Sequence, residues 1–194
     1  MTRHFINTGS NNVLEVYLDF VCPYSRKTFD KINQIILPHL KTTDLKLEMT
    51  FRNHVQPWHP QSTLVHEASL AVEKLAPEKF LAFAQVLFDN QESFFDTAID
   101  SKTRNEIYND LAELAAQFVN KEEFLNLLRI DTSTKHNNGN QVTAEFKRHL
   151  KISRHNHVHV SPTWIINGLI NDDISSGWSL DDWKKLLSTL TNNE

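Results

Sequence analysis

The residue best suited to covalent chemistry is Cys22, the single cysteine among 194 residues. It opens the run Cys22-Pro23-Tyr24-Ser25, directly after the mostly apolar segment 13–20. Pro23 suits the first position of a helix, where its missing N–H is no loss, so Cys22 is predicted to be a helix N-cap. Unpaired N–H groups and the positive end of the helix dipole favour a thiolate there. The sequence therefore predicts a nucleophilic sulfur that solvent can reach.

The neighbours of Cys22 allow more than one interpretation. A lone cysteine is more often a small buried apolar residue, but the strand before it and the proline after it favour a reactive thiol. Ser25 lies one helical turn on, where it can donate a hydrogen bond to the thiolate or be an ordinary first-turn serine. Asp19 can relay a proton to the thiol or simply lie in solvent at the end of a strand.

Composition excludes several classes of protein. Hydrophobic residues make up 40% and aromatic residues 10% of the chain, so a packed core is expected. The net charge is −4 and no basic cluster occurs, which argues against nucleic-acid binding. Residues 1–12 are polar, and no apolar stretch has membrane-spanning length, so we expect neither a secretory signal nor a membrane protein. The cytoplasm is the expected location, and a cleaved mitochondrial presequence is left open.

The first part of the chain predicts a strand–helix–strand unit. Segment 13–20 is rich in β-formers and suits a central strand. A helix should follow from Pro23 to about Leu37, with Pro38 as its stop. Residues 45–51 alternate between apolar and polar, which predicts a second strand. A helix between two strands is typical of a parallel crossover.

The rest of the chain predicts a block of helices and then a hairpin. Residues 62–129 carry helical apolar stripes, with Asn120 as the cap of the last helix. The later predicted elements are a loop over 131–139, a helix over 141–154, a strand over 158–166 that Pro162 interrupts, a turn at Asn167-Gly168 with a return strand at 169–170, and a helix over 180–190 capped by Ser179.

These motifs in this order resemble the thioredoxin fold. The resemblance rests on Cys-x-x-Ser at a helix start and on Val160-Ser161-Pro162-Thr163 before a hairpin. The helical block, and the segments 17–24, 57–60 and 161–168, are similar to the DsbA-like branch. The resemblance covers residues 13–190. It implies an α/β thioredoxin-like fold (βαβ…ββα, with a central mixed sheet) formed by 13–60 and 138–194, and an inserted helical subdomain at 61–137.

One departure from the family motif decides the expected chemistry. The usual motif is Cys-x-x-Cys, and Ser25 stands at the second position. A serine cannot resolve a mixed disulfide, so the dithiol oxidase activity of the family is not implied. A single thiolate can still attack a disulfide and then needs an outside thiol. We therefore expect a monothiol thiol–disulfide oxidoreductase with Cys22 as nucleophile, glutathione as co-substrate and no tightly bound cofactor.

The resemblance also implies a substrate-binding surface. If Pro162 is cis, the backbone of Ser161 lies beside Cys22, where its N–H and C=O can pair with a peptide or with glutathione. Pro23 and Tyr24 are expected to complete this surface. The expected substrate is a disulfide or a glutathionylated protein or small molecule; the oligomeric state and the direction of the reaction are not specified by the sequence.

Two other functions stay open. The first is a kappa-type glutathione transferase or a related isomerase, whose Ser-Pro-Tyr-Ser motif differs from this one only at the first residue. There a serine hydroxyl activates the sulfur of glutathione, whereas a thiol at that position would more readily form a disulfide with it. The second is a non-catalytic thioredoxin-fold module that only binds other proteins.

The histidines offer a weaker hypothesis. His155, His157 and His159 alternate, so on a strand they would share one face and could bind zinc or copper. Polar loop histidines are more common, and no metal site is predicted. The resemblance assigns His59 to a structural loop, which favours a packing role.

Overall fold

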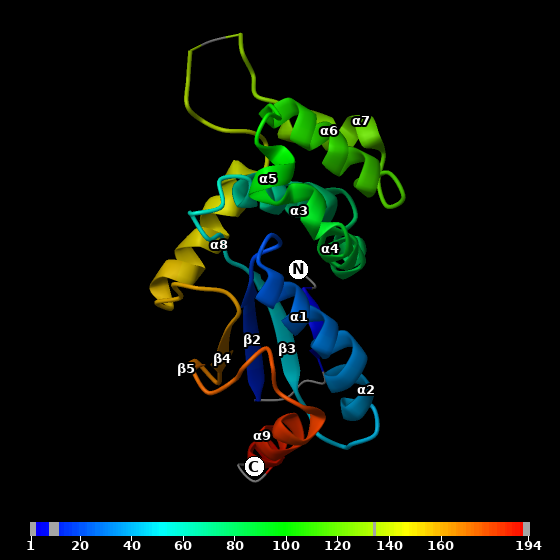
Figure 1. Ribbon diagram of the computed structural model, residues 1–194, viewed down its shortest axis with the longest axis vertical. Helices are drawn as coiled ribbons and strands as arrows, with labels where there is room; N and C mark the ends of the chain where they lie inside the picture. Colours follow the sequence, from blue (N-terminus) through cyan, green and yellow to red (C-terminus); the bar gives the residue numbers. More distant parts are fainter. Residues whose placement is uncertain (1–2, 8–11, 134, 192–194) are drawn as a thin grey trace.

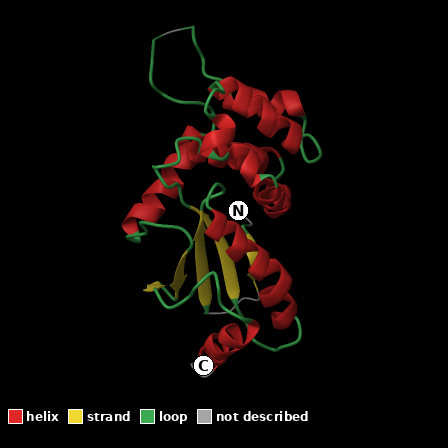
Figure 2. Ribbon diagram, viewed as in Figure 1, coloured by secondary structure: helices red, strands yellow, loops and turns green. Residues whose placement is uncertain are grey.

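A five-stranded mixed sheet forms the centre of the protein. In the computed structural model, which describes residues 3–7, 12–133 and 135–191, the strand order is β1-β3-β2-β4-β5. The central strand β2 (Val13–Leu18) pairs parallel with β3 (Glu48–Asn53) and antiparallel with β4 (Thr163–Ile166). The predicted thioredoxin-like arrangement of strands and helices is confirmed, and Figure 2 shows the sheet flanked by helices.

The sheet contains one strand that the sequence did not predict. Strand β1 (His4–Asn7) pairs antiparallel with β3 at the edge of the sheet. Its four residues are too few to show a clear alternation, which explains the omission. β3 also begins later than the predicted residue 45, because its pairing with β2 starts at Glu48 opposite Val13.

The helix that follows Cys22 is longer than predicted. It comprises α1 (Pro23–Lys31), a π-helical segment (Ile32–Ile36) and α2 (Leu37–Leu40), so the prediction that Pro38 stops the helix is wrong. The N–H of Leu37 binds the carbonyl of Ile32, five residues back. This wider turn lies where a proline would otherwise clash with the preceding α-helical turn.

The middle of the chain is helical, as predicted. It contains α3 (Ser62–Leu75), α4 (Phe80–Asp89), α5 (Asp96–Ile99), α6 (Arg104–Ala115) and α7 (Lys121–Leu128), with 3₁₀ turns at Pro77–Lys79 and Gln91–Phe94. Asn120 caps α7 by accepting hydrogen bonds from the N–H groups of Glu122 and Glu123. Figure 1 shows these helices at the end of the sheet where β2 finishes, with α9 at the other end. None of the described helices is long and apolar enough to cross a membrane.

Helix α8 (Thr143–His155) ends in a turn that corrects the predicted strand over 158–166. The N–H of Val158 binds the carbonyl of Ser153, and the N–H of His157 binds that of Arg154. This pair of bonds forms a Schellman motif, with His157 in the left-handed region at φ +54°. The chain therefore leaves the helix in a loop, and β4 begins only at Thr163. The histidines of this region do not alternate along a strand.

The C-terminal hairpin and helix agree with prediction. Asn167 and Gly168 have φ of +50° and +85°, as a two-residue hairpin turn requires, and β5 (Leu169–Asn171) returns along β4. Ser179 caps α9 (Leu180–Thr191) by accepting the N–H of Asp182. The predicted domain bounds stay a prediction, and residues 192–194 of the second thioredoxin-like segment lie outside the described residues.

Phenylalanine side chains join the sheet to the helical block. The ring of Phe20 lies 5.4 Å from that of Phe51 on β3 and 5.2 Å from that of Phe88 on α4. All three are buried, and burying such a side chain contributes about 1.5–3 kcal/mol. The segment that carries Cys22 is thus anchored on both sides.

Candidate active site around Cys22

Cys22 occupies the N-cap of α1, as the sequence predicted. Its backbone is extended, with φ −90° and ψ 119°, and Pro23 is the first helical residue. The carbonyl of Cys22 accepts the N–H groups of Ser25 and Arg26 at 3.0 and 3.2 Å. The sulfur therefore lies at the positive end of a helix dipole, which favours negative charge.

A loop from the far end of the sequence meets this sulfur. The Sγ of Cys22 lies 3.4 Å from the carbonyl oxygen of Ser161 and donates a hydrogen bond to it. The peptide bond between Ser161 and Pro162 is cis. The structure thus brings Cys22, Ser161 and Pro162 together across 139 residues of sequence.

The thiol is less accessible than the sequence led us to expect. Cys22 is only 4% exposed, while Pro23 is exposed and Tyr24 is 65% exposed. Beside Cys22 lies a hollow of about 270 Å³, lined by Val21, Pro23, His59, Phe95, Asp96 and Thr97. The two neighbours of Cys22 in the chain, Val21 and Pro23, both line this hollow.

Ser25 supports the backbone instead of the sulfur. Its side chain is fully buried, and its Oγ accepts a hydrogen bond from the N–H of Asp19 at 3.1 Å. Within the described part of the chain no hydrogen bond joins Ser25 to the sulfur of Cys22. The structure therefore corrects the predicted contact with the thiolate.

Asp19 is a buried organiser of the site and does not lie in solvent. Its carboxylate accepts hydrogen bonds from the N–H groups of Val21 (3.0 Å) and Gln56 (2.7 Å) and from the hydroxyl of Ser62 (2.9 Å). Burial alone would raise the pKa of Asp19, but the imidazole of His66 and these N–H donors outweigh it and lower the pKa. An ionised Asp19 thus ties the end of β2 to the loop after β3.

The loop after β3 also fixes the position of Ser161, the residue that contacts the sulfur. The side-chain Oε1 of Gln56 accepts a hydrogen bond from the N–H of Ser161 at 3.0 Å. The predicted free backbone of Ser161 is therefore engaged within the chain, its N–H by Gln56 and its C=O by Cys22. Gln56 carried no local signal in the sequence, because its role depends on a contact 105 residues away.

A second glutamine fixes the segment from the helical side. The Nε2 of Gln91 donates hydrogen bonds to the carbonyls of Phe20 (2.7 Å) and Cys22 (3.0 Å). Gln91 is 2% exposed and lies in the 3₁₀ turn after α4. It was also missed at the sequence level, since nothing near it in sequence indicates this contact.

Comparison with known proteins assigns the family. The family model described as thioredoxin matches residues 2–188. The chain belongs to the thioredoxin family. No curated protein matches this thioredoxin-family chain.

Solved structures show the same fold in its DsbA-like form. A putative protein-disulfide isomerase from Pseudomonas syringae is 25% identical, with a TM-score of 0.72, covering 92% of this chain and 93% of that one. BdbD from Bacillus subtilis is 18% identical, with a TM-score of 0.66 and coverage of 98% and 93%. DsbA from Chlamydia trachomatis is 14% identical, with a TM-score of 0.63 and coverage of 98% and 91%. The predicted DsbA-like thioredoxin fold is confirmed.

Several histidines of this thioredoxin-family protein gather near the site. His66 is fully buried, with Nδ1 2.6 Å from Nδ2 of Asn53 and Nε2 3.7 Å from Oδ1 of Asp19. His59 borders the hollow beside Cys22 and lies 3.5 Å from Asp96. Burial lowers the pKa of His54. Across the described residues, no three metal-ligating side chains come together.

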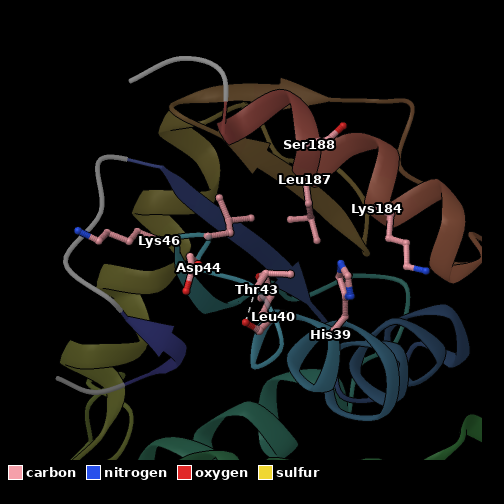
Figure 3. A pocket seen from close by; sticks show the side chains of 9 residues that line it. His39, Leu40, Thr43, Asp44, Lys46, Lys184, Leu187 and Ser188 are labelled. Carbon is pink, nitrogen blue, oxygen red and sulfur yellow. Dashed lines mark hydrogen bonds between the residues drawn. The ribbon is translucent and has the colours of Figure 1, made fainter.

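A separate hollow lies at the opposite end of the sheet, between the α2 region and α9. It encloses about 380 Å³, and Figure 3 shows His39 and Leu187 directed toward its middle. Thr43 closes one side by donating a hydrogen bond to the carbonyl of Leu40 at 3.1 Å. No sulfur lines this hollow, so it is not the site of thiol chemistry.

Proposed function

We propose that this protein is a monothiol thiol–disulfide oxidoreductase that uses Cys22 as nucleophile and glutathione as the resolving thiol. The observation that carries the proposal is the position of the sulfur. It lies at the N-cap of α1 and touches Ser161, next to the cis peptide bond, in a DsbA-like fold. A serine in the second motif position leaves one thiol to do the chemistry.

The proposed reaction has two exchanges. The thiolate of Cys22 attacks the glutathione sulfur of a glutathionylated substrate; a Cys22–glutathione disulfide forms and the substrate leaves as a thiolate. A second glutathione thiolate then attacks the glutathione sulfur of that disulfide. Cys22 is released as thiolate and oxidised glutathione leaves. In sum, the glutathionylated substrate and one reduced glutathione become the free substrate thiol and one oxidised glutathione.

The arrangement around Cys22 supports a resting state in which Ser161 covers the sulfur, so a substrate has to displace Ser161 before it can react. The carbonyl of Ser161 covers the sulfur at 3.4 Å, and Gln56 holds the N–H of the same residue. A peptide or glutathione backbone that pairs with Ser161 would take the place of Gln56. Binding of the substrate therefore replaces the hydrogen bond from Ser161 to Gln56 with one to the substrate, which keeps the free-energy cost of displacing Gln56 low.

Reduced glutathione has to be present for the second exchange. We therefore propose the cytoplasm as the compartment, in keeping with a single cysteine and no structural disulfide. The substrate is a glutathionylated protein or small molecule.

The decisive experiment combines mass spectrometry with turnover. Incubation with oxidised glutathione should add about 305 Da to the protein, and reduced glutathione should remove the adduct. Turnover of a mixed disulfide of glutathione with a small thiol should disappear in Cys22→Ser. Absence of both adduct and turnover in the wild-type protein would overturn the proposal and favour a binding module.

The Cys22→Ser variant also distinguishes the proposed oxidoreductase from a kappa-type glutathione transferase. A kappa-type transferase would conjugate glutathione to an electrophile, and that activity would survive Cys22→Ser because a serine hydroxyl occupies the first motif position there. We expect no conjugation by either protein.

A further inference from the structure

A cavity whose wall carries one arginine and three histidines lies beside the hollow next to Cys22. It encloses about 420 Å³, within the usual range for small-ligand sites. Its wall comes from the loop after β3, the end of α8 and the loop before Ser161; the polar and charged members are His54, His59, Thr63, Ser153, Arg154 and His159. His59 also borders the hollow beside Cys22, so the two spaces share a wall.

The charges around this cavity favour an anion. Arg154 is exposed and, within the described part of the chain, has no carboxylate partner. No aspartate or glutamate lines the cavity. Behind its wall the carboxylate of Asp19 acts on His54, and that of Asp96 lies 3.5 Å from His59. A guanidinium without a partner is well suited to bind a carboxylate in a bidentate manner.

A buried polar wall residue has hydrogen-bonding capacity left over. His54 is 6% exposed and its ring interacts with the backbone of His159, which leaves at least one ring nitrogen without a partner among the described residues. A buried polar group without a partner costs about 1–3 kcal/mol, so a ligand that supplies one gains affinity. This second observation is independent of the charge on Arg154.

The cavity also lies within reach of the reacting sulfur. His159 is two residues before Ser161, whose carbonyl touches Sγ of Cys22. Two residues span at most about 7 Å. The sulfur of glutathione lies on its middle residue, so only one arm of the tripeptide, also about 7 Å long when extended, can reach from Cys22 into the cavity. A tripeptide thiol can therefore place its sulfur at Cys22 and one end in the cavity.

We propose that this cavity binds a carboxylate of glutathione, with Arg154 as its ionic partner and His54 as a hydrogen-bonding partner in the wall. This inference rests on the glutathione-linked function proposed above. It names the part of the chain that selects an anionic tripeptide over a neutral thiol. Free glutathione and glutathione bound to a protein present the same carboxylates.

The test uses a ligand that binds without reacting. S-methylglutathione has no free thiol, so its affinity for the wild-type protein measures non-covalent binding without disulfide formation. We expect Arg154→Gln to weaken binding about tenfold, as loss of a charge-assisted hydrogen bond implies. Arg148→Gln is the matched control, because Arg148 is an exposed arginine on the same helix that does not line this cavity. The dimethyl ester of S-methylglutathione should bind about as weakly to the wild-type protein as the acid binds to Arg154→Gln.

A spectroscopic measurement locates the ligand. In protein with labelled histidine rings, the signals of His54 should move on addition of S-methylglutathione, while those of His39 at the opposite end should not. Equal affinity for acid and ester, no effect of Arg154→Gln, or no binding at all would each overturn the inference.

The two proposals fail in different ways. If Cys22 forms its glutathione adduct equally fast in the wild-type protein and Arg154→Gln, the oxidoreductase function stands and the cavity does not serve it. If S-methylglutathione binds and Arg154→Gln weakens it, but Cys22 never reacts, the cavity stands and the proposed function is wrong.

Discussion

The side chain of Gln56 holds the backbone N–H of Ser161 at 3.0 Å, and Ser161 in turn covers the sulfur of Cys22 with its carbonyl at 3.4 Å. The backbone N–H of Gln56 is held by the carboxylate of Asp19 at 2.7 Å. Hydrogen bonds therefore run from the end of β2, through the loop after β3, to the loop before β4 and back to Cys22. The accessibility of the Cys22 thiol therefore depends on the stability of these hydrogen bonds, which hold Ser161 over the sulfur.

Gln56→Leu should make the thiol more reactive. The substitution removes the acceptor of the Ser161 N–H, which loosens the loop over Cys22. Because a hydrogen bond of this kind is worth about 1 kcal/mol net, we expect alkylation of Cys22 by iodoacetamide to be about fivefold faster. The rate is measured by mass spectrometry. Gln61→Leu is the control, since Gln61 is equally buried but binds Phe94 and Asp96 instead; equal rates in both variants would contradict the prediction.

Asp19→Asn should weaken folding and change its dependence on acid. An amide cannot accept all the hydrogen bonds that the carboxylate accepts, so we expect a loss of about 3 kcal/mol in the free energy of unfolding. The pKa of Asp19 is lowered from its ordinary value of 3.8. Its contribution is therefore present above that pH and is lost as pH falls through the folded value.

Urea denaturation at several pH values measures both effects of Asp19→Asn. The exposed Asp100 provides the matched substitution Asp100→Asn. A loss below 1 kcal/mol for Asp19→Asn, comparable to that control, would show that the carboxylate does not organise the site.

Ser25→Cys should create a dithiol. The fold already places residue 25 one turn after Cys22 on α1, so an internal disulfide should form and lower the mass by about 2 Da on oxidation. The reduced form should lose about 1 kcal/mol of stability, because a thiol accepts the Asp19 N–H more weakly than a hydroxyl.

Thr28→Cys is the control for this prediction. Thr28 is buried on the same helix, but six residues from Cys22 correspond to about 9 Å of helical rise, too far for a disulfide. Reduction of a protein disulfide by Ser25→Cys, but not by Thr28→Cys, is the expected result. If neither variant forms the internal bond, residue 25 is not in the position that the fold assigns to it.

His149 should make the fold sensitive to mild acid. The pKa of His149 is lowered to about 3 from 6.5. Burial is the largest cause, and the charges of Arg3, His66 and Arg52 add to it. Between these values the unfolded chain binds a proton that the folded protein does not, so stability falls as pH falls. The slope from this one group is at most about 1.4 kcal/mol per pH unit.

Chemical denaturation of His149→Gln between pH 7 and about 4 checks this effect, with the exposed substitution His155→Gln on the same helix as control. The wild-type protein should lose more stability over this range than His149→Gln. Parallel curves for the two proteins would contradict the assignment.

Local patterns in the sequence were sufficient for much of the fold. The apolar strand before Cys22, the turn at Asn167-Gly168 and the cap at Asn120 all act over a few residues, and all three are present. Pro38 was misread because a π-helical turn accommodates it, and such a turn depends on packing that the local sequence does not encode. His157 occupies a left-handed position usually given to glycine, which concealed the loop before β4.

The site was only partly predictable for the same reason. Cys22 and Pro162 stand in recognisable motifs, so their roles could be proposed from the sequence. Gln56 and Gln91 act through contacts of more than sixty residues in sequence, and no motif indicated them. Of the two alternatives left open for Ser25, neither named the observed partner of its hydroxyl, which is a backbone N–H that precedes the motif.

The side chain of Gln91 has a consequence for engineering. Its amide donates to the carbonyls of both Phe20 and Cys22 from within the helical block. A chimera that exchanged this block for a relative's, without an amide at the corresponding place, would remove these two hydrogen bonds from the segment that bears the thiol. The helical block and the segment that carries Cys22 should therefore be moved together.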